Sequence, residues 1–237
     1  MGYSSNLYEK TESAAEAFGV AAVLVNYRVS GEHLIRGFLS GFQEQNNGQE
    51  TKLNDGYIGW VNNGFWRKGK VLTIGQQIRG VFPSSKNSYR RDEKLLGVTV
   101  APSFMFNLTP VGLRGVTLIY QPQFNKNAHR LEQNRQFQNN TSYNVNQSLA
   151  LVWSITDHIY LQNSFIYAMA WSYGGVKRPD SYQFFYEAGY SFNSGMTWSL
   201  GVSNSGPIRS FENGNDQTIE LFNNKTASVY TDLTFVF

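Results

Sequence analysis

Apolar and polar positions alternate with a period of two along most of this chain. The clearest stretch runs from Tyr143 to Ile155, and similar stretches occupy 72–82, 116–124, 159–172 and 182–192. Successive side chains of a β-strand point to opposite faces, so each stretch predicts a strand with one apolar face and one small or polar face. The stretches also approach the 9 to 11 residues that a tilted strand needs to cross a bilayer, whereas most soluble strands are shorter.

The connections between these stretches alternate between short and long, which is typical of a barrel with tight turns at one end and long loops at the other. The short ones lie near Ser30–Glu32, Arg67–Gly69, Thr109–Gly112, Thr156–Asp157 and Asn193–Gly195. The long, polar ones cover Gln43–Asp55, Pro83–Lys94, Asn125–Asn140, Ser172–Asp180 and Ser203–Lys225. When strand directions are assigned alternately, starting from the last strand, all short turns fall at one end of the barrel and all long loops at the other. We therefore predict an all-β, antiparallel, up-and-down transmembrane β-barrel.

The last residues, Val229 to Phe237, alternate in the same way and end on Phe237. This ending resembles the closing strand of bacterial outer-membrane β-barrels, and over nearly the whole chain the pattern resembles that class, including its porins. The resemblance implies an integral outer-membrane location, recognition of the last strand by the barrel-assembly machinery, and contact with lipids including lipopolysaccharide. A soluble sandwich or a lipocalin-like barrel is the alternative interpretation.

Eleven strands fit between Phe18 and Phe237, and an even number requires a twelfth, for which only Tyr3–Lys10 is available. We predict twelve strands, with ten and fourteen as alternatives, in one domain over residues 1–237. The apolar segment Ala14–Val25 follows acidic residues rather than the basic leader of a signal peptide, so we expect it to belong to the folded chain.

Composition excludes several other classes of protein. Only 16% of the 237 residues are charged and the net charge is +3, which argues against a nucleic-acid-binding protein. No apolar stretch is long enough for a transmembrane helix. The absence of Cys excludes thiolate metal sites, thiol nucleophiles and disulfides. We expect no metal and no cofactor.

Aromatic residues make up 15% of the chain and many lie near the predicted strand ends. Amphipathic rings settle at the headgroup level of a bilayer, so they are expected to face outward as two girdles. The predicted girdle residues are Tyr57, Trp60, Trp66, Tyr120, Trp153, Trp171, Tyr190, Trp198 and Phe237.

If the apolar positions face outward, the alternate positions line the lumen. Among these, Arg28, Arg36 and Arg79 fall on early strands, and Glu187 and Asp232 fall on late ones. Closing the sheet should set a basic wall against an acidic wall and produce a transverse field that selects small polar solutes. Alternatively, these residues form salt bridges that plug the lumen. Small inward residues such as Ser148 and Ala150 favour an open bore, whereas Phe38, Phe185 and Tyr230 would narrow it.

Enzymatic activity is not expected. A general base would have to be His33, His129 or His158, and none has a nucleophile at the spacing found in barrel phospholipases. Gly-rich phosphate loops are absent. The loops carry a basic rim that could contact lipid phosphates: Lys86, Arg90, Arg91, Lys94, Lys126, Arg130 and Arg135.

Two hypotheses remain. In the first, the chain is a porin-like channel for passive diffusion of small hydrophilic solutes or ions, filtered by the charged lumen. In the second, it is a closed structural or adhesive outer-membrane barrel that acts through its loops, notably Pro83–Lys94 and Ser203–Lys225.

Overall fold

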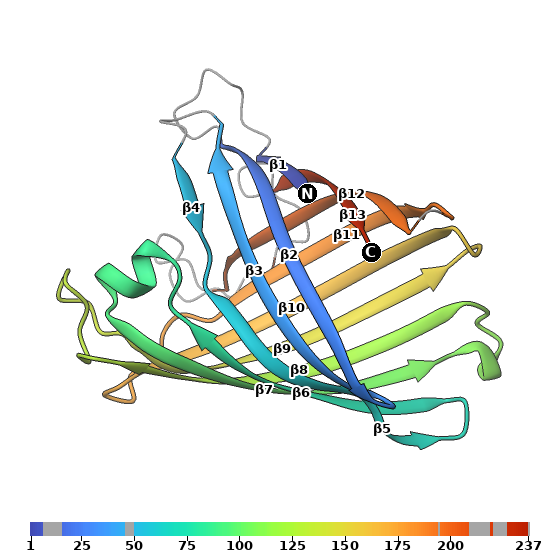
Figure 1. The fold of residues 1–237 in the computed structure, drawn as a ribbon, viewed down its shortest axis with the longest axis horizontal. Coiled ribbons are helices and arrows are strands. Elements are labelled where there is room, and N and C mark those ends of the chain that lie inside the picture. Colours follow the sequence, from blue (N-terminus) through green and yellow to red (C-terminus); the bar gives the residue numbers. More distant parts are fainter. Residues whose placement is uncertain (7–15, 46–49, 194, 209–218, 220–226, 237) are drawn as a thin grey trace.

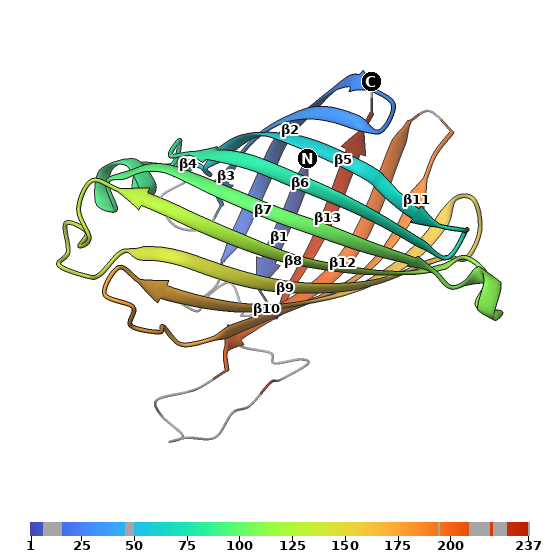
Figure 2. The same ribbon diagram turned by 90° about the horizontal axis from the view of Figure 1, so that it is seen from below.

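The computed structural model of the chain is a closed, antiparallel barrel of twelve strands with one short extra strand (Figures 1 and 2). It describes residues 1–6, 16–45, 50–193, 195–208, 219 and 227–236. The predicted all-β, antiparallel, up-and-down barrel and the predicted strand count are confirmed. The first strand is Gly2–Asn6, which overlaps the predicted segment Tyr3–Lys10 at residues 3–6.

The twelve barrel strands are β1 (Gly2–Asn6), β2 (Ala17–Ser30), β3 (His33–Glu44), β5 (Gly56–Lys68), β6 (Leu72–Phe82), β7 (Lys94–Asn107), β8 (Val116–His129), β9 (Thr141–Ser154), β10 (Ile159–Ser172), β11 (Ser181–Ser191), β12 (Met196–Pro207) and β13 (Ser228–Phe235). The extra strand β4 (Thr51–Leu53) pairs antiparallel with residues 41–43 at the loop end of β3. Two short helices interrupt the connections: η1, a π-helix over Asn87–Arg91, and η2, a 3₁₀-helix over Thr109–Val111. No helix in the described ranges has the length and apolar character needed to span a membrane.

From β5 to β13 each strand pairs with the next one along the chain, and β3 pairs with both β2 and β5. The ring closes through β1, which pairs with β13 on one side and with β2 on the other. The short turns gather at one end of the barrel and the long loops at the other (Figures 1 and 2). We call these the turn end and the loop end. Two of the turns place Gly31 and Gly69 at positive φ, a conformation that glycine adopts without strain.

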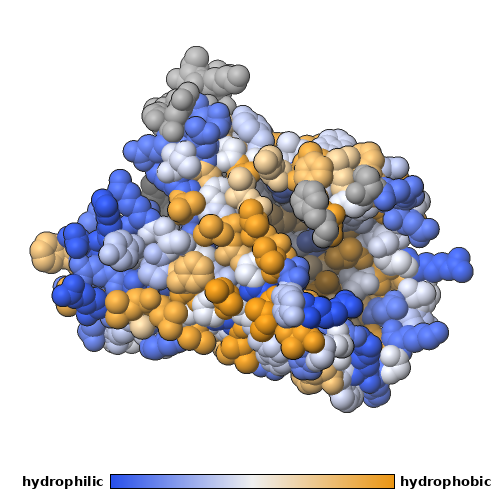
Figure 3. All heavy atoms as spheres, viewed as in Figure 1, coloured by the Kyte–Doolittle hydropathy of each residue, from blue (hydrophilic) through white to orange (hydrophobic). Residues whose placement is uncertain are grey.

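Residues that pair directly across strands share a face of the sheet, so the register assigns each side chain to the outside or to the lumen. One continuous outer row runs through Ile35, Trp60, Ile78, Val100 and Phe124. In Figure 3, apolar side chains gather over the middle of the visible outer face, and hydrophilic ones lie toward the two ends. The visible part of the outer face therefore carries an apolar band between polar rims.

The junction between β1 and β2 is short. Among the described residues, β1 pairs with Ala17–Val20 only, and Ala21–Ser30 of β2 have ladder partners on β3 alone. Figure 3 shows a hollow between β2 and the strands β12 and β13 of Figure 1. Leu24, which lies on the lumen face opposite Phe38, is consequently 48% exposed.

Candidate functional site

The interior of the barrel contains a cavity of about 590 Å³. Its lining comes from eight strands and is mostly polar or small. The lining residues are Tyr3, Ser4, Val20, Ile119, Gln121, Ser148, Ala150, Gln162, Ser164, Ile166, Phe185, Glu187, Ser203, Tyr230 and Asp232. Of the five lumen charges predicted from the sequence, Glu187 and Asp232 line this cavity, whereas Arg28, Arg36 and Arg79 do not. Phe185 and Tyr230 narrow it, and Phe38 is not part of its lining.

One lumen wall is basic. A row of directly paired residues runs from Arg36 on β3 through Gly59 on β5 to Arg79 on β6. The Arg36 Nε donates to Oδ1 of Asn26 at 2.8 Å, and the Arg79 Nη2 donates to Oε1 of Gln123 at 3.1 Å. Gln123 lies two residues from Gln121, which lines the cavity, so the row faces the lumen.

Arg28 belongs to the same face but lies apart from this row. It pairs with Leu34, nearer to the turn that joins β2 and β3. The predicted cationic residues therefore separate into the pair Arg36 and Arg79, with Arg28 displaced toward the turn end.

The opposite wall is acidic, and its Glu187 carboxylate is held by two tyrosine hydroxyls. The hydroxyl of Tyr160 donates to Oε1 of Glu187 at 2.7 Å, and that of Tyr230 donates to Oε2 at 3.0 Å. Each tyrosine faces a glycine on the neighbouring strand: Tyr160 pairs with Gly189 and Tyr230 with Gly201.

These glycines allow the rings to lie flat on the sheet. A Cβ built on Gly189 would lie 2.2 Å from the Tyr160 ring, and one on Gly201 would lie 2.3 Å from the Tyr230 ring. Asp232 lies beside this cluster and pairs with Ser199 and with Gly2. Both lumen carboxylates are thus accommodated by glycine positions.

The two walls face each other across the barrel. From β6 to β11 the ring has five strand steps through β7, β8, β9 and β10, and seven steps the other way. Five steps also separate β3 from β11, and β6 from β13, so the strand of Arg79 lies across the ring from the strands of both carboxylates, and the strand of Arg36 lies across from that of Glu187. Within the described parts of the chain, none of the five predicted lumen charges forms an ion pair within 4.0 Å.

The aromatic residues predicted for the girdles divide into three groups. Those on outward rows are Trp60, Trp66, Tyr120, Trp153, Trp171, Tyr190 and Trp198. Tyr57 is a correction: it lies on the lumen face, where it stacks on Phe38 at 5.3 Å between ring centroids. Tyr57 and Trp60 are three residues apart, so a regular strand turns them to opposite faces. Phe237 lies outside the described residues.

The three histidines lie in separate places. His33 accepts a hydrogen bond at Nδ1 from Nε1 of Trp60 at 3.2 Å, His129 lies 3.1 Å from the hydroxyl of Tyr173, and His158 lies 2.9 Å from a backbone oxygen. None of these contacts pairs a histidine with a carboxylate or a serine hydroxyl. Among the described residues, no three His, Asp or Glu side chains converge in a way that could hold a metal ion.

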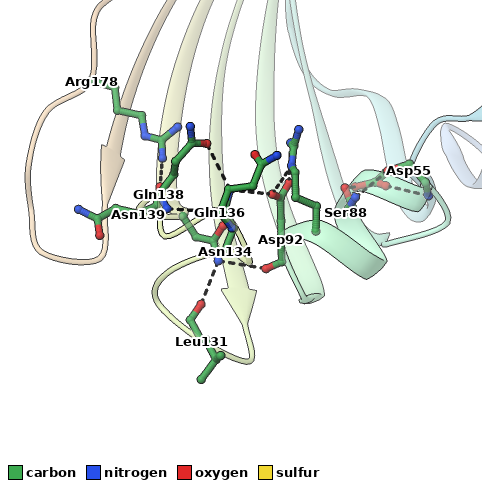
Figure 4. A network of polar contacts seen from close by, with 12 residues as sticks. Asp55, Ser88, Asp92, Leu131, Asn134, Gln136, Gln138, Asn139 and Arg178 are labelled. Atoms are coloured by element: carbon green, nitrogen blue, oxygen red, sulfur yellow. Dashed lines mark hydrogen bonds and ion pairs between the residues drawn. The ribbon is translucent and has the colours of Figure 1, made fainter.

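At the loop end, the loops before β7 and β9 are joined by polar contacts (Figure 4). Asn140, which is 4% exposed, donates to the backbone oxygens of Asp92 and Leu131, both at 3.0 Å. Asn134 donates to the Asp92 carboxylate at 3.4 Å, and Arg178, from the loop before β11, donates to the backbone oxygen of Asn139. Three loops therefore form one connected layer over this part of the barrel.

A separate group of hydrogen bonds, centred on Asp55, fixes η1 to the start of β5. The Asp55 carboxylate accepts from the Ser88 hydroxyl at 2.8 Å, the Ser85 amide at 3.2 Å and the Lys94 Nζ at 3.1 Å. Burial alone would raise the pKa of Asp55, but these hydrogen bonds and the Lys94 charge outweigh it and lower the pKa below its usual value.

The basic rim is only partly neutralised. Arg91 pairs with Asp92, Lys94 with Asp55 and Arg135 with Glu93. In the part of the chain that the structure describes, the remaining rim residues form no ion pair: Lys86, Arg90, Lys126 and Arg130.

Comparisons with known protein families and curated proteins identify no relative of this chain. No protein-family model matches the chain, and a search of curated proteins finds no similar sequence. Any functional conclusion therefore depends on the barrel itself and on the residues that line it.

Proposed function

We propose that this chain is an integral barrel of the bacterial outer membrane that forms a porin-like channel for passive diffusion of small hydrophilic solutes or ions. The distribution of apolar side chains supports the membrane location. Val25 and Ile58 are 60% and 61% exposed on the outer face, and further large apolar residues are exposed there, including Ile35, Ile78 and Phe124. Exposed apolar area on this scale is unfavourable in water but favourable against lipid tails.

The observation that best supports the channel function is that, within the described ranges, the charged side chains of the lumen do not pair with one another. The wall with Arg36 and Arg79 lies opposite the wall with Glu187 and Asp232, and no ion pair joins the two walls among the described residues. A plug built from salt bridges would bring these groups within about 4 Å of one another. Charges of opposite sign on separate parts of the lumen wall leave a field across the lumen, which favours passage of small polar solutes.

The outward aromatic residues fit the proposed orientation. Trp66, Trp153, Tyr190 and Trp198 lie within two residues of strand ends at the turn end, and Trp171 lies one residue from the loop end of β10. These are the depths at which girdle residues meet headgroups. We propose that the uncompensated rim cations contact lipopolysaccharide phosphates, and that the last strand is the signal for the assembly machinery.

The test is conductance of the refolded chain in planar lipid bilayers. We expect stable single-channel currents, and Arg79→Ala should shift ion selectivity toward cations by removing one fixed positive charge from the lumen. Arg130→Ala is the matched control, because Arg130 is exposed in a loop and should leave selectivity unchanged. A folded barrel without conductance would contradict the channel function.

The loop layer favours a second candidate, a closed adhesive barrel. Asn134 and Asn140 are buried within the loop layer and the anchor at Asp55 holds η1, so the loop end presents a defined surface. A silent barrel whose loop surface binds a partner, with binding abolished by Asn140→Ala, would support this candidate over the channel.

A further inference from the structure

The basic wall of the lumen contains a gap between two arginines. Arg36 and Arg79 occupy the same row of paired residues, and the residue between them is Gly59. Strands lie about 4.8 Å apart, so the two Cα atoms are separated by about 10 Å with no side chain between them. We call the set Arg36, Gly59 and Arg79 the arginine notch.

Gly59 is needed for the notch to exist in this form. A Cβ built on Gly59 would lie 2.7 Å from Cβ of Arg79 and 2.7 Å from the backbone oxygen of Ile78. Both contacts are closer than real Cβ atoms approach other atoms. Any other residue would displace Arg79 and place a side chain in the row between the two arginines.

The guanidinium of Arg79 is held from two sides while keeping donors free. Its Cζ lies 4.9 Å from the centroid of the Tyr57 ring, and Nη2 donates to Gln123. Its Nε is buried without a hydrogen-bond partner among the described residues, and so is Nε2 of Gln77, two residues earlier on the same face. Buried donors of this kind normally have an acceptor.

Arg36 completes the arrangement from the other side. Its Nε is occupied by Asn26, which leaves the two terminal nitrogens for a ligand. Neither arginine has a carboxylate partner in the described residues. Two fixed cations with unused planar donors are suited to an oxyanion that carries at least two negative charges, because guanidinium binds carboxylate and phosphate groups through paired hydrogen bonds.

We infer that the arginine notch is a binding site for small multiply charged oxyanions, with Arg36 and Arg79 each contacting the anion and Gln77 supplying a further donor. This inference rests on the proposed channel function only for the route by which the anion reaches the lumen. Binding itself requires the folded barrel and no current.

The experiment is calorimetric titration of the refolded barrel in non-ionic detergent at about 0.15 M salt, where the Debye length of about 8 Å suppresses long-range attraction. The probes are succinate, inorganic phosphate and the uncharged amide succinamide. We expect succinate or phosphate to bind and succinamide not to bind. Binding of succinate alone identifies a dicarboxylate site and binding of phosphate alone a phosphate site. Failure of both anions would overturn the inference.

Variants separate the notch from the general charge of the lumen. Arg36→Gln and Arg79→Gln should each weaken anion binding by about tenfold or more, the usual effect of losing hydrogen bonds to a charged group. Arg114→Gln removes the same charge from the exposed turn between β7 and β8, away from the lumen and the basic rim, and should have no effect. If Arg28→Gln weakens binding as much as Arg79→Gln, the lumen field rather than the notch attracts the anion, and the inference is wrong.

Gly59→Ala tests the geometry with every charge retained. We expect it to weaken anion binding, and unchanged binding would contradict the notch. Arg36→Lys and Arg79→Lys provide a second test if Gly59→Ala does not fold, because lysine keeps the charge but loses the planar donors. Conductance measured in parallel keeps the two proposals distinct: a conducting barrel without anion binding overturns only the notch, and a silent barrel that binds anions overturns only the channel.

Discussion

At the scale of single residues, glycine positions determine how the lumen side chains are arranged. Gly189 and Gly201 allow two tyrosine rings to lie flat so that their hydroxyls meet on Glu187, and Gly59 leaves the space beside Arg79. In each case a large side chain on one strand lies over a glycine on the neighbouring strand. The charged groups are therefore positioned by cross-strand pairs rather than by their own rotamers alone.

Adding a methyl group at these glycines should destabilise the barrel. For Gly189→Ala or Gly201→Ala we expect a loss of about 1–3 kcal/mol, the usual cost of overpacking, because the new Cβ meets a tyrosine ring. Urea unfolding in detergent measures this loss. Gly37→Ala is the matched control, since a Cβ there meets nothing within 4 Å. Equal stability of Gly37→Ala and Gly189→Ala would show that the tyrosine rings do not cover the glycines.

Asp55 should make the stability of the loop end depend on pH. Its pKa in the folded chain lies below the ordinary value of 3.8, despite burial, because Ser88, Ser85 and Lys94 favour the carboxylate. A lowered folded-state pKa stabilises the fold above the unfolded pKa, and that contribution disappears as the pH falls through the folded value.

We therefore expect Asp55→Asn to lower the urea midpoint at pH 7, and the difference from wild type to shrink as the pH drops below about 3.8. Asp157→Asn, in the exposed turn after β9, should leave this pH dependence unchanged. A difference that stays constant between about pH 7 and pH 3 would show that Asp55 acts through packing and not through its charge.

At the scale of elements, the strands could be predicted from sequence because alternation reports directly on which face is apolar. Residues 143–155, for example, lie almost entirely within β9, and the turns near Gly31 and Gly69 fall where short connections were predicted. The short pieces β4 and η1 inside long loops could not, since three to five residues carry too little periodicity.

The sequence predicts which face of the sheet each site residue occupies, but it does not predict which residues contact one another. Alternation assigns Arg79 and Glu187 to the lumen. The Tyr160–Gly189 and Tyr230–Gly201 pairs, and the alignment of Arg36 with Arg79 across Gly59, depend on the register between strands. Aromatic type alone predicts that Tyr57 faces outward with Trp60, but the odd spacing between them sets the two rings on opposite faces, and that spacing is visible in the sequence.

Hydrogen exchange should distinguish β2 from the other long strands. Ala21–Ser30 have described ladder partners only on β3, so about half of their amides should be protected. In β9, which pairs with both β8 and β10, nearly all amides should be protected. Residue-resolved exchange by NMR in micelles measures both strands in one sample. Full protection of Ala21–Ser30 would mean that a further strand covers this edge of β2.

At the scale of the whole molecule, the barrel separates charge across its lumen instead of neutralising it. Five strand steps lie between the strands that carry Arg36 or Arg79 and those that carry Glu187 or Asp232, apart from the nearer pair β3 and β13. In the proposed channel, a solute that crosses the lumen would pass between strands that carry the cations on one side and strands that carry the anions on the other. Such a field orients dipolar solutes and selects ions according to which wall is stronger.

Removing charge from one wall or from the other should shift the ion selectivity of the lumen in opposite directions. Glu187→Gln with Asp232→Asn leaves the arginines unopposed and should shift reversal potentials toward anion selectivity, whereas Arg36→Gln with Arg79→Gln should shift them toward cations. Both shifts should be large near 0.1 M salt, where the Debye length is about 10 Å, and small at 1 M, where it is about 3 Å. Shifts of the same sign in the two variants, or shifts that persist at about 1 M, would mean that steric changes and not opposed fixed charges set the selectivity of the lumen.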